Sequence, residues 1–468
     1  MSRLHTVEKI GGTSMSRFKE LMDNIFLENL KQNELYNRIF VVSAYSGMTN
    51  MLLEHKKTGE PGVYASFAKC DGEWKRLLEN VRRKMLKINH FLEDIGLNVN
   101  EADSFVNERV DGIKACLQDL LRIHSYGHLS AENYLPASRE FLSALGEAHS
   151  AFNSVLILQA NGVNACFVDL TGWKETTTYP INKVIQKAFK KIDLNTELPI
   201  VTGYTKCSEG MMRLFDRGYS EITFSKLAVV TNASEGVIHK EYHLCTGDPQ
   251  LFGTDKVRVI GNTNFDIADQ LADMDMEAIH SSASKEMEMK NISIRVKNAF
   301  EPEHPGTLIS RDYVSPIPKV DMICGRNDIL AVEVYDSDMV GQPGYDYRLL
   351  NAFNKFGINY IAKNTNANTI THYIGENEKS PTEAIEVMKK EFPKAKIRVI
   401  EVSVVCVMGT NMAIPGFLSK SSNALAEAGI NILALDQCLR QVNMQFVIER
   451  SKFEQAQLAL HKALVETI

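Results

Sequence analysis

The most constraining feature of this sequence is an internal repeat near its C-terminal end. Segment 343–359 (PGYDYRLLNAFNKFGIN) aligns without gaps with segment 415–431 (PGFLSKSSNALAEAGIN), and 7 of 17 positions are identical at a constant offset of 72 residues. Each copy has the pattern of a loop, a helix, a glycine stop and an apolar strand, with further strands before and after it. Two such units predict a pair of ferredoxin-like α+β modules.

A proline-rich stretch separates this repeat from the rest of the chain. Such a density of prolines is typical of a domain boundary rather than of the interior of a helix or strand. We therefore predict one large N-terminal domain over residues 1–305 and two modules over residues 319–395 and 396–468. The four prolines at the boundary are Pro302, Pro305, Pro316 and Pro318.

The N-terminal domain alternates strand and helix patterns. Short apolar strands are predicted at Thr6–Ile10 and Arg38–Ala44, each followed by a turn rich in glycine and serine and then by a helix. A polar, helical excursion over about 64–125 interrupts the alternation, which then resumes. This order is typical of an α/β sheet covered by helices. The predicted fold class is α/β, followed by the two α+β modules.

Composition narrows the classes of function. The 468 residues are 44% hydrophobic and carry a formal net charge of −6, which argues against disorder and against binding to nucleic acid or anionic membranes. No apolar run approaches the roughly 20 residues of a membrane span. The N-terminus lacks a secretory core, and the eight cysteines include no C-x-x-C pair. We expect a cytoplasmic protein with no membrane or nucleic-acid partner and no metal held by protein ligands.

Two glycine-containing turns point to chemistry on phosphates. Lys9 ends the first strand, directly before Gly11-Gly12-Thr13-Ser14, and the second strand leads into Ser43 to Gly47. Glycines let backbone N–H groups approach a phosphate, and a lysine supplies the positive charge that phosphoryl transfer requires. A single turn of this kind is more often structural, but two facing turns can hold a polyphosphate. The chain has neither a P-loop nor the protein-kinase motifs.

At these residues the sequence resembles the aspartate kinases of the amino-acid kinase family. The resemblance covers nearly the whole chain apart from the helical excursion, and the C-terminal repeat then matches a pair of regulatory ACT modules. It rests on the segments VEKIGGTS (7–14), VSAYSGMTN (42–50), GEAHSA (146–151), PIVTGY (199–204), VKNAFEP (296–302) and GTLI (306–309).

The resemblance implies a role for particular residues, with ATP and Mg²⁺ as cofactors. The residues implied in catalysis are Lys9, Arg217 and Glu221. Those implied in ATP binding are Lys9, Gly11, Gly12, Ser14, Ser43, Gly47, Thr246 and Asp248. Those implied in binding L-aspartate are Thr49, Glu147, Tyr204, Arg217 and Ser220. The chemistry is consistent with this division, because a dicarboxylic amino acid needs a cation for a carboxylate and an acid for its ammonium.

Several positions depart from the family pattern. The segment FDRGYSE (215–221) places Glu221 where the family has aspartate and Tyr219 where it has glycine, a variant that resembles the aspartate kinases associated with ectoine synthesis. In lysine-inhibited relatives the position of Ile361 is acidic, so lysine feedback is not implied here. The nucleotide half loses two cations and gains one acid, which leaves open the roles of His239, Lys240, Gln250 and Glu277.

The leading hypothesis is ATP-dependent phosphorylation of the β-carboxylate of L-aspartate to 4-phospho-L-aspartate, the first step of aspartate-family amino-acid or ectoine synthesis. A second hypothesis is a kinase for another acidic substrate such as glutamate. A third is a catalytically silent amino-acid sensor that uses the ACT pair alone. ACT modules usually self-associate, so the resemblance also implies a homodimer or a higher homo-oligomer.

Overall fold

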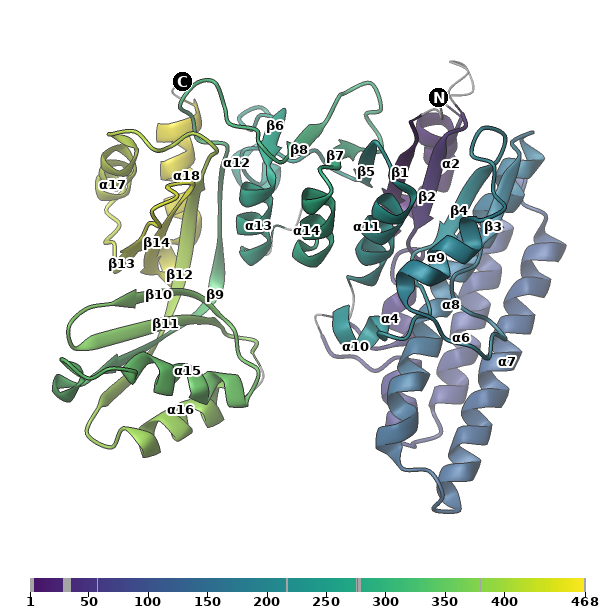
Figure 1. Cartoon of the computed structure of the whole chain (residues 1–468), viewed down its shortest axis with the longest axis horizontal. Helices are drawn as coiled ribbons and strands as arrows, with labels where there is room; N and C mark the ends of the chain where they lie inside the picture. Colours follow the sequence, from purple (N-terminus) through teal and green to yellow (C-terminus); the bar gives the residue numbers. More distant parts are fainter. Residues whose placement is uncertain are drawn as a thin grey trace. The chain divides into compact units, whose positions relative to one another are not determined.

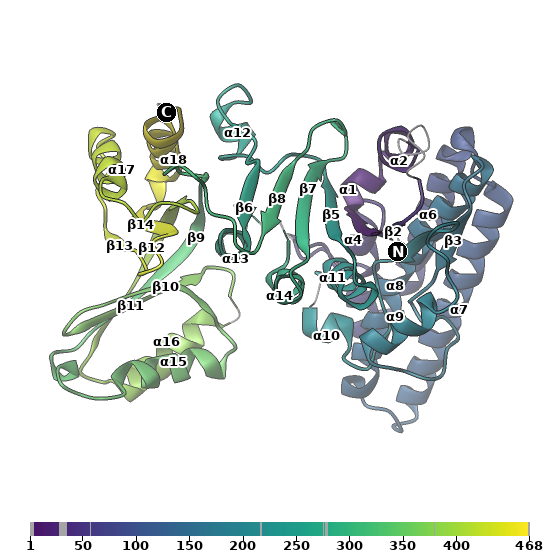
Figure 2. The ribbon, with the colours of Figure 1, turned by 45° about the horizontal axis from the view of Figure 1, so that its top comes forward.

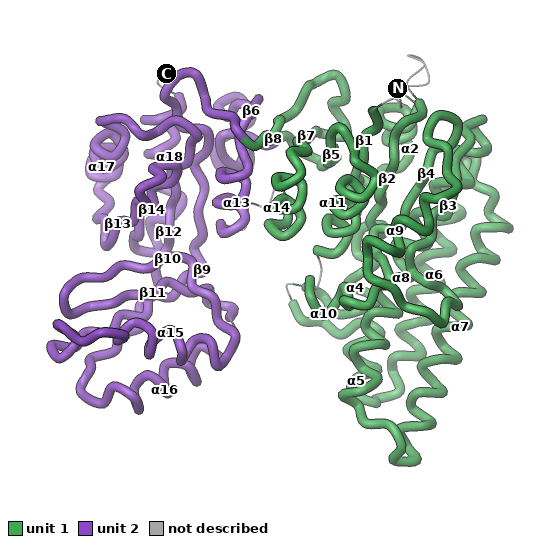
Figure 3. The backbone as a smooth tube through the Cα atoms, viewed as in Figure 1, with its two compact units in different colours: residues 1–243, 279–311 green, residues 244–278, 312–468 purple. Residues whose placement is uncertain are grey.

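The computed structural model describes residues 4–27, 35–56, 58–215, 218–274, 276, 279–378 and 380–466. The chain forms two compact units (Figures 1 and 3). The first comprises residues 1–243 and 279–311, and the second comprises residues 244–278 and 312–468. The second unit thus takes in a stretch, 244–278, that lies well before the proline-rich segment. The domain boundaries predicted above remain a proposal.

The first unit is built on a mainly parallel sheet with strand order β3-β4-β2-β1-β5-β7-β8, in which only β8 runs antiparallel to its neighbour β7. The short apolar strands at its centre are buried along their whole length, as expected for parallel strands covered on both faces. The strands are β1 (Thr6–Ile10), β2 (Arg38–Val42), β3 (Ala165–Val168), β4 (Leu198–Thr202), β5 (Glu235–Lys240), β7 (Ser293–Asn298) and β8 (Thr307–Ser310).

Helices cover this sheet, and the resulting mixed α/β architecture confirms the predicted fold class (Figure 2). The helical turns and helices of the unit are α1 (Gly12–Met15), α2 (Phe18–Leu21), η1 (Met22–Phe26), α4 (Met48–Leu52), α5 (Val63–Ala68), α6 (Trp74–Phe91), η2 (Glu93–Ile95), α7 (Val99–Ser125), α8 (Ala131–Ala160), α9 (Ile181–Phe189), α10 (Met211–Phe215), α11 (Tyr219–Thr231) and α14 (Ser281–Met289).

Helices α6, α7 and α8 lie side by side, and α6 and α7 account for most of the predicted polar, helical excursion (Figures 1 and 2). The buried residues of α6 recur at a spacing of three or four, which places them on one face: Trp74, Leu78, Val81, Met85 and Asn89. Among the described residues, α8 alone is long and apolar enough by composition to cross a membrane. Since 83% of that apolar window is buried inside the protein, α8 has the character of a core helix.

The second unit contains a six-stranded antiparallel sheet of order β10-β11-β9-β12-β14-β13. Its strands are β9 (Met322–Tyr335), β10 (Tyr360–Thr365), β11 (Thr369–Gly375), β12 (Lys396–Met408), β13 (Ala434–Asp436) and β14 (Asn443–Glu449), and the unit also contains β6 (Asn262–Asn264). Its helices and helical turns are α12 (Pro249–Phe252), α13 (Phe265–Asp273), η3 (Ser337–Met339), α15 (Tyr345–Lys355), α16 (Pro381–Glu391), α17 (Phe417–Glu427), η4 (Arg450–Lys452), α18 (Phe453–His461) and η5 (Lys462–Glu466).

Two long strands belong to both repeated modules. The second half of β9 pairs with β11 and with the first half of β12, whereas the first half of β9 pairs with the second half of β12, which in turn pairs with β14. The register shifts where the halves meet, between Val402 and Val404 of β12. The two modules therefore share one continuous sheet. The first half of β9 pairs with the half of β12 that belongs to the second module, and only the second half of β9 pairs with β11 of the first module.

The glycines shared by the two copies of the internal repeat have a structural explanation. Gly344 and Gly416 precede α15 and α17 with φ of 76° and 110°, and Gly357 and Gly429 follow these helices with φ of 66° and 68°. A positive φ is costly for residues with a side chain, so glycine is favoured at both ends of both helices. The apolar run Ile430–Leu435 predicts a strand after the second helix, whereas the structure confines this strand to β13.

Candidate active site

The two predicted phosphate loops meet at the carboxyl ends of neighbouring parallel strands. β1 leads into Gly11–Ser14 and β2 leads into Ser43–Gly47, and the two strands pair in parallel. A Cβ atom at Gly12 would lie 2.6 Å from the carbonyl oxygen of Ala44, so only glycine permits this approach of the loops. Gly47 has a φ of 78° and open space around its Cα. These glycines make the kind of cradle that a polyphosphate requires.

A cavity of about 260 Å³ opens between these loops and the helices α8 and α11. Six of the residues predicted to bind ATP or aspartate line it together: Gly12, Ser43, Gly47, Thr49, Glu147 and Ser220. Thr13, Ala44, Tyr45, Ser46 and Tyr219 complete its lining. The fold thus brings residues from four distant parts of the sequence to one small cavity.

Lys9 lies at the end of β1 and is only 8% exposed. Its Nζ atom donates a hydrogen bond to Oε1 of Glu221 on α11 over 3.1 Å, and the backbone N–H of His280 donates to Oε2 of the same carboxylate over 2.6 Å. Burial alone would raise the pKa of Glu221, but the ammonium groups of Lys9 and Lys240 and these hydrogen bonds hold it below its ordinary value. Glu221 is therefore ionised at neutral pH, and its hydrogen bond orients the Lys9 side chain.

Glu147 presents a carboxylate to the cavity from the buried middle of α8. Its Oε1 accepts a 2.6 Å hydrogen bond from the hydroxyl of Ser220, and its Oε2 is buried without a hydrogen-bond partner among the described residues. Burial raises the pKa of Glu147 to about 8, although Ser220, Lys9 and the nearby backbone N–H groups of Tyr204 and Ala44 act in the opposite direction. A buried carboxylate oxygen without a partner is costly, and a cationic ligand such as an ammonium group would satisfy it.

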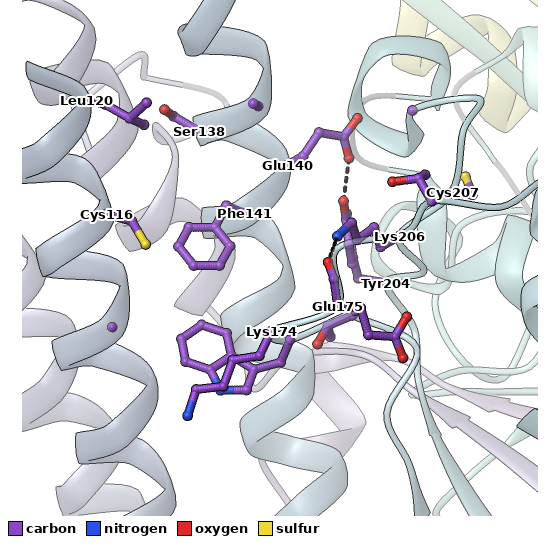
Figure 4. A pocket seen from close by; sticks show the side chains of 17 residues that line it. Cys116, Leu120, Ser138, Glu140, Phe141, Lys174, Glu175, Tyr204, Lys206 and Cys207 are labelled. Carbon is purple, nitrogen blue, oxygen red and sulfur yellow. Dashed lines mark hydrogen bonds between the residues drawn. The ribbon is translucent and has the colours of Figure 1, made fainter. Parts of the chain in front are cut away.

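Tyr204 follows β4 and does not line this small cavity directly. Its ring contacts that of Tyr219, with 5.7 Å between centroids, and its hydroxyl donates to Oε2 of Glu140 over 2.6 Å. On the other side of Tyr204 lies a larger cavity of about 590 Å³. Figure 4 shows Glu140 joined to Tyr204 on one side of this cavity, with Cys116, Leu120 and Phe141 on the side of the helices.

Two residues near the first loop have partners that the sequence does not reveal. The hydroxyl of Ser14, predicted to contact ATP, donates to Oε1 of Glu241 over 2.8 Å. The side chain of His239 is buried and its Nε2 lies 2.7 Å from Oε2 of Glu8, which also makes a bidentate pair with Arg38. His239 therefore fixes β5 to β1 instead of presenting its ring to a ligand, while its carbonyl oxygen accepts from the N–H of Gly11 over 3.4 Å.

The remaining predicted residues are not part of the described cavity. Thr246 and Asp248 belong to the second unit. Thr246 is buried, and its hydroxyl lies 3.2 Å from Nε2 of His461. The side chain of Asp248 accepts a hydrogen bond from the backbone N–H of Gln250 at the start of α12. Arg217 and Glu277 lie outside the described residues. The described residues contain no cluster of three metal-ligating side chains.

The sequence patterns did not assign a role to some residues that line the cavity or that hold the predicted site residues in place. Tyr219 could have been found, because it replaces a glycine of the family motif beside Ser220. Glu241, Glu140 and Arg38 carried no motif signal, and Glu8 lies within segment 7–14 without a predicted role. Their contacts join segments that are far apart in the chain.

Known proteins resemble this chain over nearly its whole length. The model of the amino acid kinase family matches residues 5–298, and an ACT domain model matches residues 405–464. The aspartate kinase Ask_Ect of Stutzerimonas stutzeri (strain A1501) is 48% identical over 465 residues, which cover 99% of this chain and 98% of that protein. Aspartokinase 3, chloroplastic, of Arabidopsis thaliana is 23% identical, and the match covers 99% of this chain and 82% of that protein.

Solved structures share the fold. The crystal structure of E. coli aspartokinase III in complex with aspartate and ADP superimposes with a TM-score of 0.74 at 18% identity, and the match covers 98% of this chain and 99% of that one. The chain belongs to the amino acid kinase family. Within it, the chain groups with the aspartate kinases that carry C-terminal ACT domains.

Proposed function

We propose that this protein transfers the γ-phosphoryl group of ATP to the β-carboxylate of L-aspartate and releases ADP and 4-phospho-L-aspartate. The observation that carries the proposal is the buried Oε2 atom of Glu147, which has no partner among the described residues and belongs to a side chain lining the cavity beside two glycine loops. A carboxylate with a free oxygen suits the ammonium of an amino acid, and the loops suit its phosphate donor.

The substrate is held by groups of opposite charge. The ammonium of aspartate pairs with Glu147, whose other oxygen is already fixed by Ser220. Arg217 pairs with a carboxylate of aspartate in the bidentate manner that a guanidinium allows. Thr49 and Tyr204 complete the aspartate site. Since Tyr204 is anchored by Glu140, its ring provides a rigid wall against Tyr219.

The chemical step needs no general base, because the β-carboxylate of aspartate is ionised at neutral pH. A carboxylate oxygen forms a bond to the γ-phosphorus while the bond from that phosphorus to the β–γ bridging oxygen breaks, and ADP leaves with the bridging oxygen. Lys9 neutralises the negative charge on the moving phosphoryl group and is held in place by Glu221. Positioning and charge neutralisation supply the rate acceleration.

Membership of the amino acid kinase family implies a nucleoside triphosphate donor. The glycine cradle and the buried Lys9 suit its phosphates, with Gly11, Gly12, Ser43 and Gly47 against them and Ser14 as a further contact. Mg²⁺ would accompany the phosphates and add positive charge there. We also propose a cytoplasmic location and a homodimer or higher homo-oligomer joined through the ACT modules.

The test is aspartate-dependent release of ADP from the purified protein with Mg·ATP, with the acyl phosphate trapped by hydroxylamine. The proposal expects turnover with L-aspartate and little with L-glutamate. Turnover with glutamate alone would assign the chain to the second hypothesis. Absence of turnover with either substrate, together with binding of an amino acid to the ACT modules, would support the silent sensor.

We expect Arg217→Ala to raise the KM for aspartate by about 100-fold while the KM for ATP changes little, because a charged bidentate contact to the substrate is lost. Steady-state kinetics with each substrate varied in turn measures this split. The matched control is Arg213→Ala, an exposed arginine of α10 whose guanidinium donates only to the carbonyl of Glu209 among the bonds described. An unchanged KM for aspartate in Arg217→Ala would contradict its role.

We expect millimolar L-lysine to leave the activity within about twofold of the uninhibited rate, because an apolar side chain supplies no charge partner for an ammonium group. Ile361 lies on β10 and is packed against buried apolar residues of the sheet. Titration of the purified protein with lysine, and separately with threonine, measures the effect. Strong inhibition by lysine would refute the inference drawn from Ile361.

A further inference from the structure

Two tyrosine rings lie between the two cavities described above. Tyr219, on α11, lines the cavity of about 260 Å³ that also contains Glu147 and Ser220. Tyr204, in the loop after β4, lines the cavity of about 590 Å³. The two rings meet edge to face, with 5.7 Å between their centroids and 78° between their planes. Tyr204 therefore supports Tyr219 from behind, and the two together form a tyrosine wall on one side of the smaller cavity.

Glu140 on α8 fixes the phenol group of Tyr204. Its Oε2 accepts a 2.6 Å hydrogen bond from the Tyr204 hydroxyl (Figure 4), and its Oε1 accepts one of 2.9 Å from the backbone N–H of Met212 in α10. Burial and the Glu140 carboxylate raise the pKa of Tyr204, so its hydroxyl stays protonated and remains a donor. Glu140 lies seven residues before Glu147, so both acids project from one face of α8.

The larger cavity gives the ring of Tyr204 a place into which it can move. Its lining is largely apolar and includes Leu120, Phe141 and Trp173 (Figure 4). A cavity of about 590 Å³ is large enough for a small-molecule ligand, and therefore for a displaced phenol ring. Tyr204 is buried but borders this space, and among the described residues Glu140 is the one hydrogen-bond partner of its hydroxyl. This bond therefore opposes movement of the ring away from Tyr219.

The loop that carries Tyr204 also packs directly against the groups proposed to hold the substrate ammonium. A Cβ atom at Gly203 would lie 2.9 Å from Oε2 of Glu147 and 2.9 Å from Oγ of Ser220, so only glycine permits this approach. The residue that follows is Tyr204 itself. A change in the position of Tyr204 is therefore transmitted over a short distance to the side of the smaller cavity that contains Glu147.

We propose that the hydrogen bond between Glu140 and Tyr204 sets the substrate specificity, because it holds the tyrosine wall in place against acidic amino acids one methylene longer than aspartate. The proposal rests on the proposed function. With the ammonium at Glu147 and the acceptor carboxylate at the phosphate loops, both ends of the substrate are fixed, and an extra methylene has to be accommodated against the wall. A rigid pocket discriminates against one methylene by roughly 10-fold to 200-fold. Glu140 is a positioning residue and contacts no substrate.

The test uses Tyr204→Phe, which removes the hydroxyl and keeps the ring. The kcat/KM for L-aspartate and for L-glutamate is measured with Mg·ATP, and the dissociation constants of both amino acids are measured by calorimetry with a non-hydrolysable ATP analogue. We expect the preference for aspartate to fall about tenfold in both measurements, with little change in the KM for ATP. Glu140→Gln should change the preference in the same direction. The double variant should lose no more than Tyr204→Phe alone, because the same interaction is removed.

The matched control is Tyr126→Phe, which removes the same hydroxyl from a tyrosine that is 76% exposed at the end of α7. Thermal unfolding checks that each variant is folded, and Glu140→Gln carries the test if Tyr204→Phe is not. A folded variant whose preference for aspartate stays within about twofold of the wild type would overturn the proposal, as would equal losses for the two amino acids. If the wild type bound both amino acids without turnover, the proposed function would fail, while the ratio of dissociation constants would still decide the role of the bond.

Discussion

Lys9→Ala is expected to abolish aspartate-dependent ADP release, with kcat reduced by at least about 1,000-fold, or about 4 kcal/mol of transition-state stabilisation. The reason is geometric as well as electrostatic. Lys9 is the penultimate residue of β1, close to the glycine loop, and its ammonium is held by Glu221 at 3.1 Å, so a mobile side chain would not supply a charge at the same fixed place. Steady-state and single-turnover kinetics with saturating substrates measure the loss.

The loss of activity has to be separated from a loss of structure. Removing Lys9 leaves the mostly buried Glu221 with fewer partners, and we expect a destabilisation of about 1–3 kcal/mol. The double variant Lys9→Ala/Glu221→Gln removes the unpaired charge and should regain most of that stability in urea unfolding. If it also regained activity, Lys9 would be a structural partner of Glu221 and its assignment to the phosphoryl group would be wrong.

The parts of the fold that follow from local patterns could be predicted from the sequence. The internal repeat predicted two α+β modules, and its identical glycines are those with a positive φ at the helix ends. The α/β character of the N-terminal part followed from short apolar strands that alternate with helices. The sharing of β9 and β12 between the modules could not be predicted, because it depends on long-range pairing rather than on local pattern.

The residues of the candidate site fall into the same two groups: those that local motifs identify and those whose contacts depend on long-range pairing. Gly12, Ser43, Gly47, Thr49, Glu147 and Ser220 were found from motifs and lie around one cavity. The role of His239 could not be read from the sequence, because a residue near the end of a strand can point to either face of the sheet. Its burial against Glu8 depends on the pairing of β5 with β1, which is set by the whole sheet. Glu241 is hidden for a similar reason, since its partner Ser14 is 227 positions away.

The variant Glu147→Gln is expected to separate stability from aspartate binding. Glutamine keeps an oxygen that can accept the hydrogen bond from Ser220, so the variant should fold. It lacks the charge for the substrate ammonium, and we expect the KM for aspartate to rise by about 30-fold to 100-fold with little change in the KM for ATP. Glu147→Asp is the control that keeps the charge but moves it by one methylene.

The same carboxyl group predicts a pH dependence. Its pKa is raised from 4.5 to about 8 in the folded protein, so between these values the folded state holds a proton that the unfolded state has released. This contribution to stability is fully present below pH 4.5 and is lost as the pH rises to about 8. Glu147→Gln has no such proton, so its melting temperature should rise relative to that of the wild type between pH 6 and pH 8.5.

Aspartate should bind more tightly as the pH rises, whereas the contribution of Glu147 to stability is lost as the pH rises. Only the ionised form of Glu147 pairs with the ammonium, so the KM for aspartate should fall as the pH rises toward the pKa of about 8, by up to about tenfold per pH unit. Measuring this KM between pH 6.5 and pH 8.5 for wild type and Glu147→Gln tests the assignment, because the variant should show a flat profile. Parallel profiles for the two proteins would mean that another group titrates, and Glu147 would then not be the partner of the substrate ammonium.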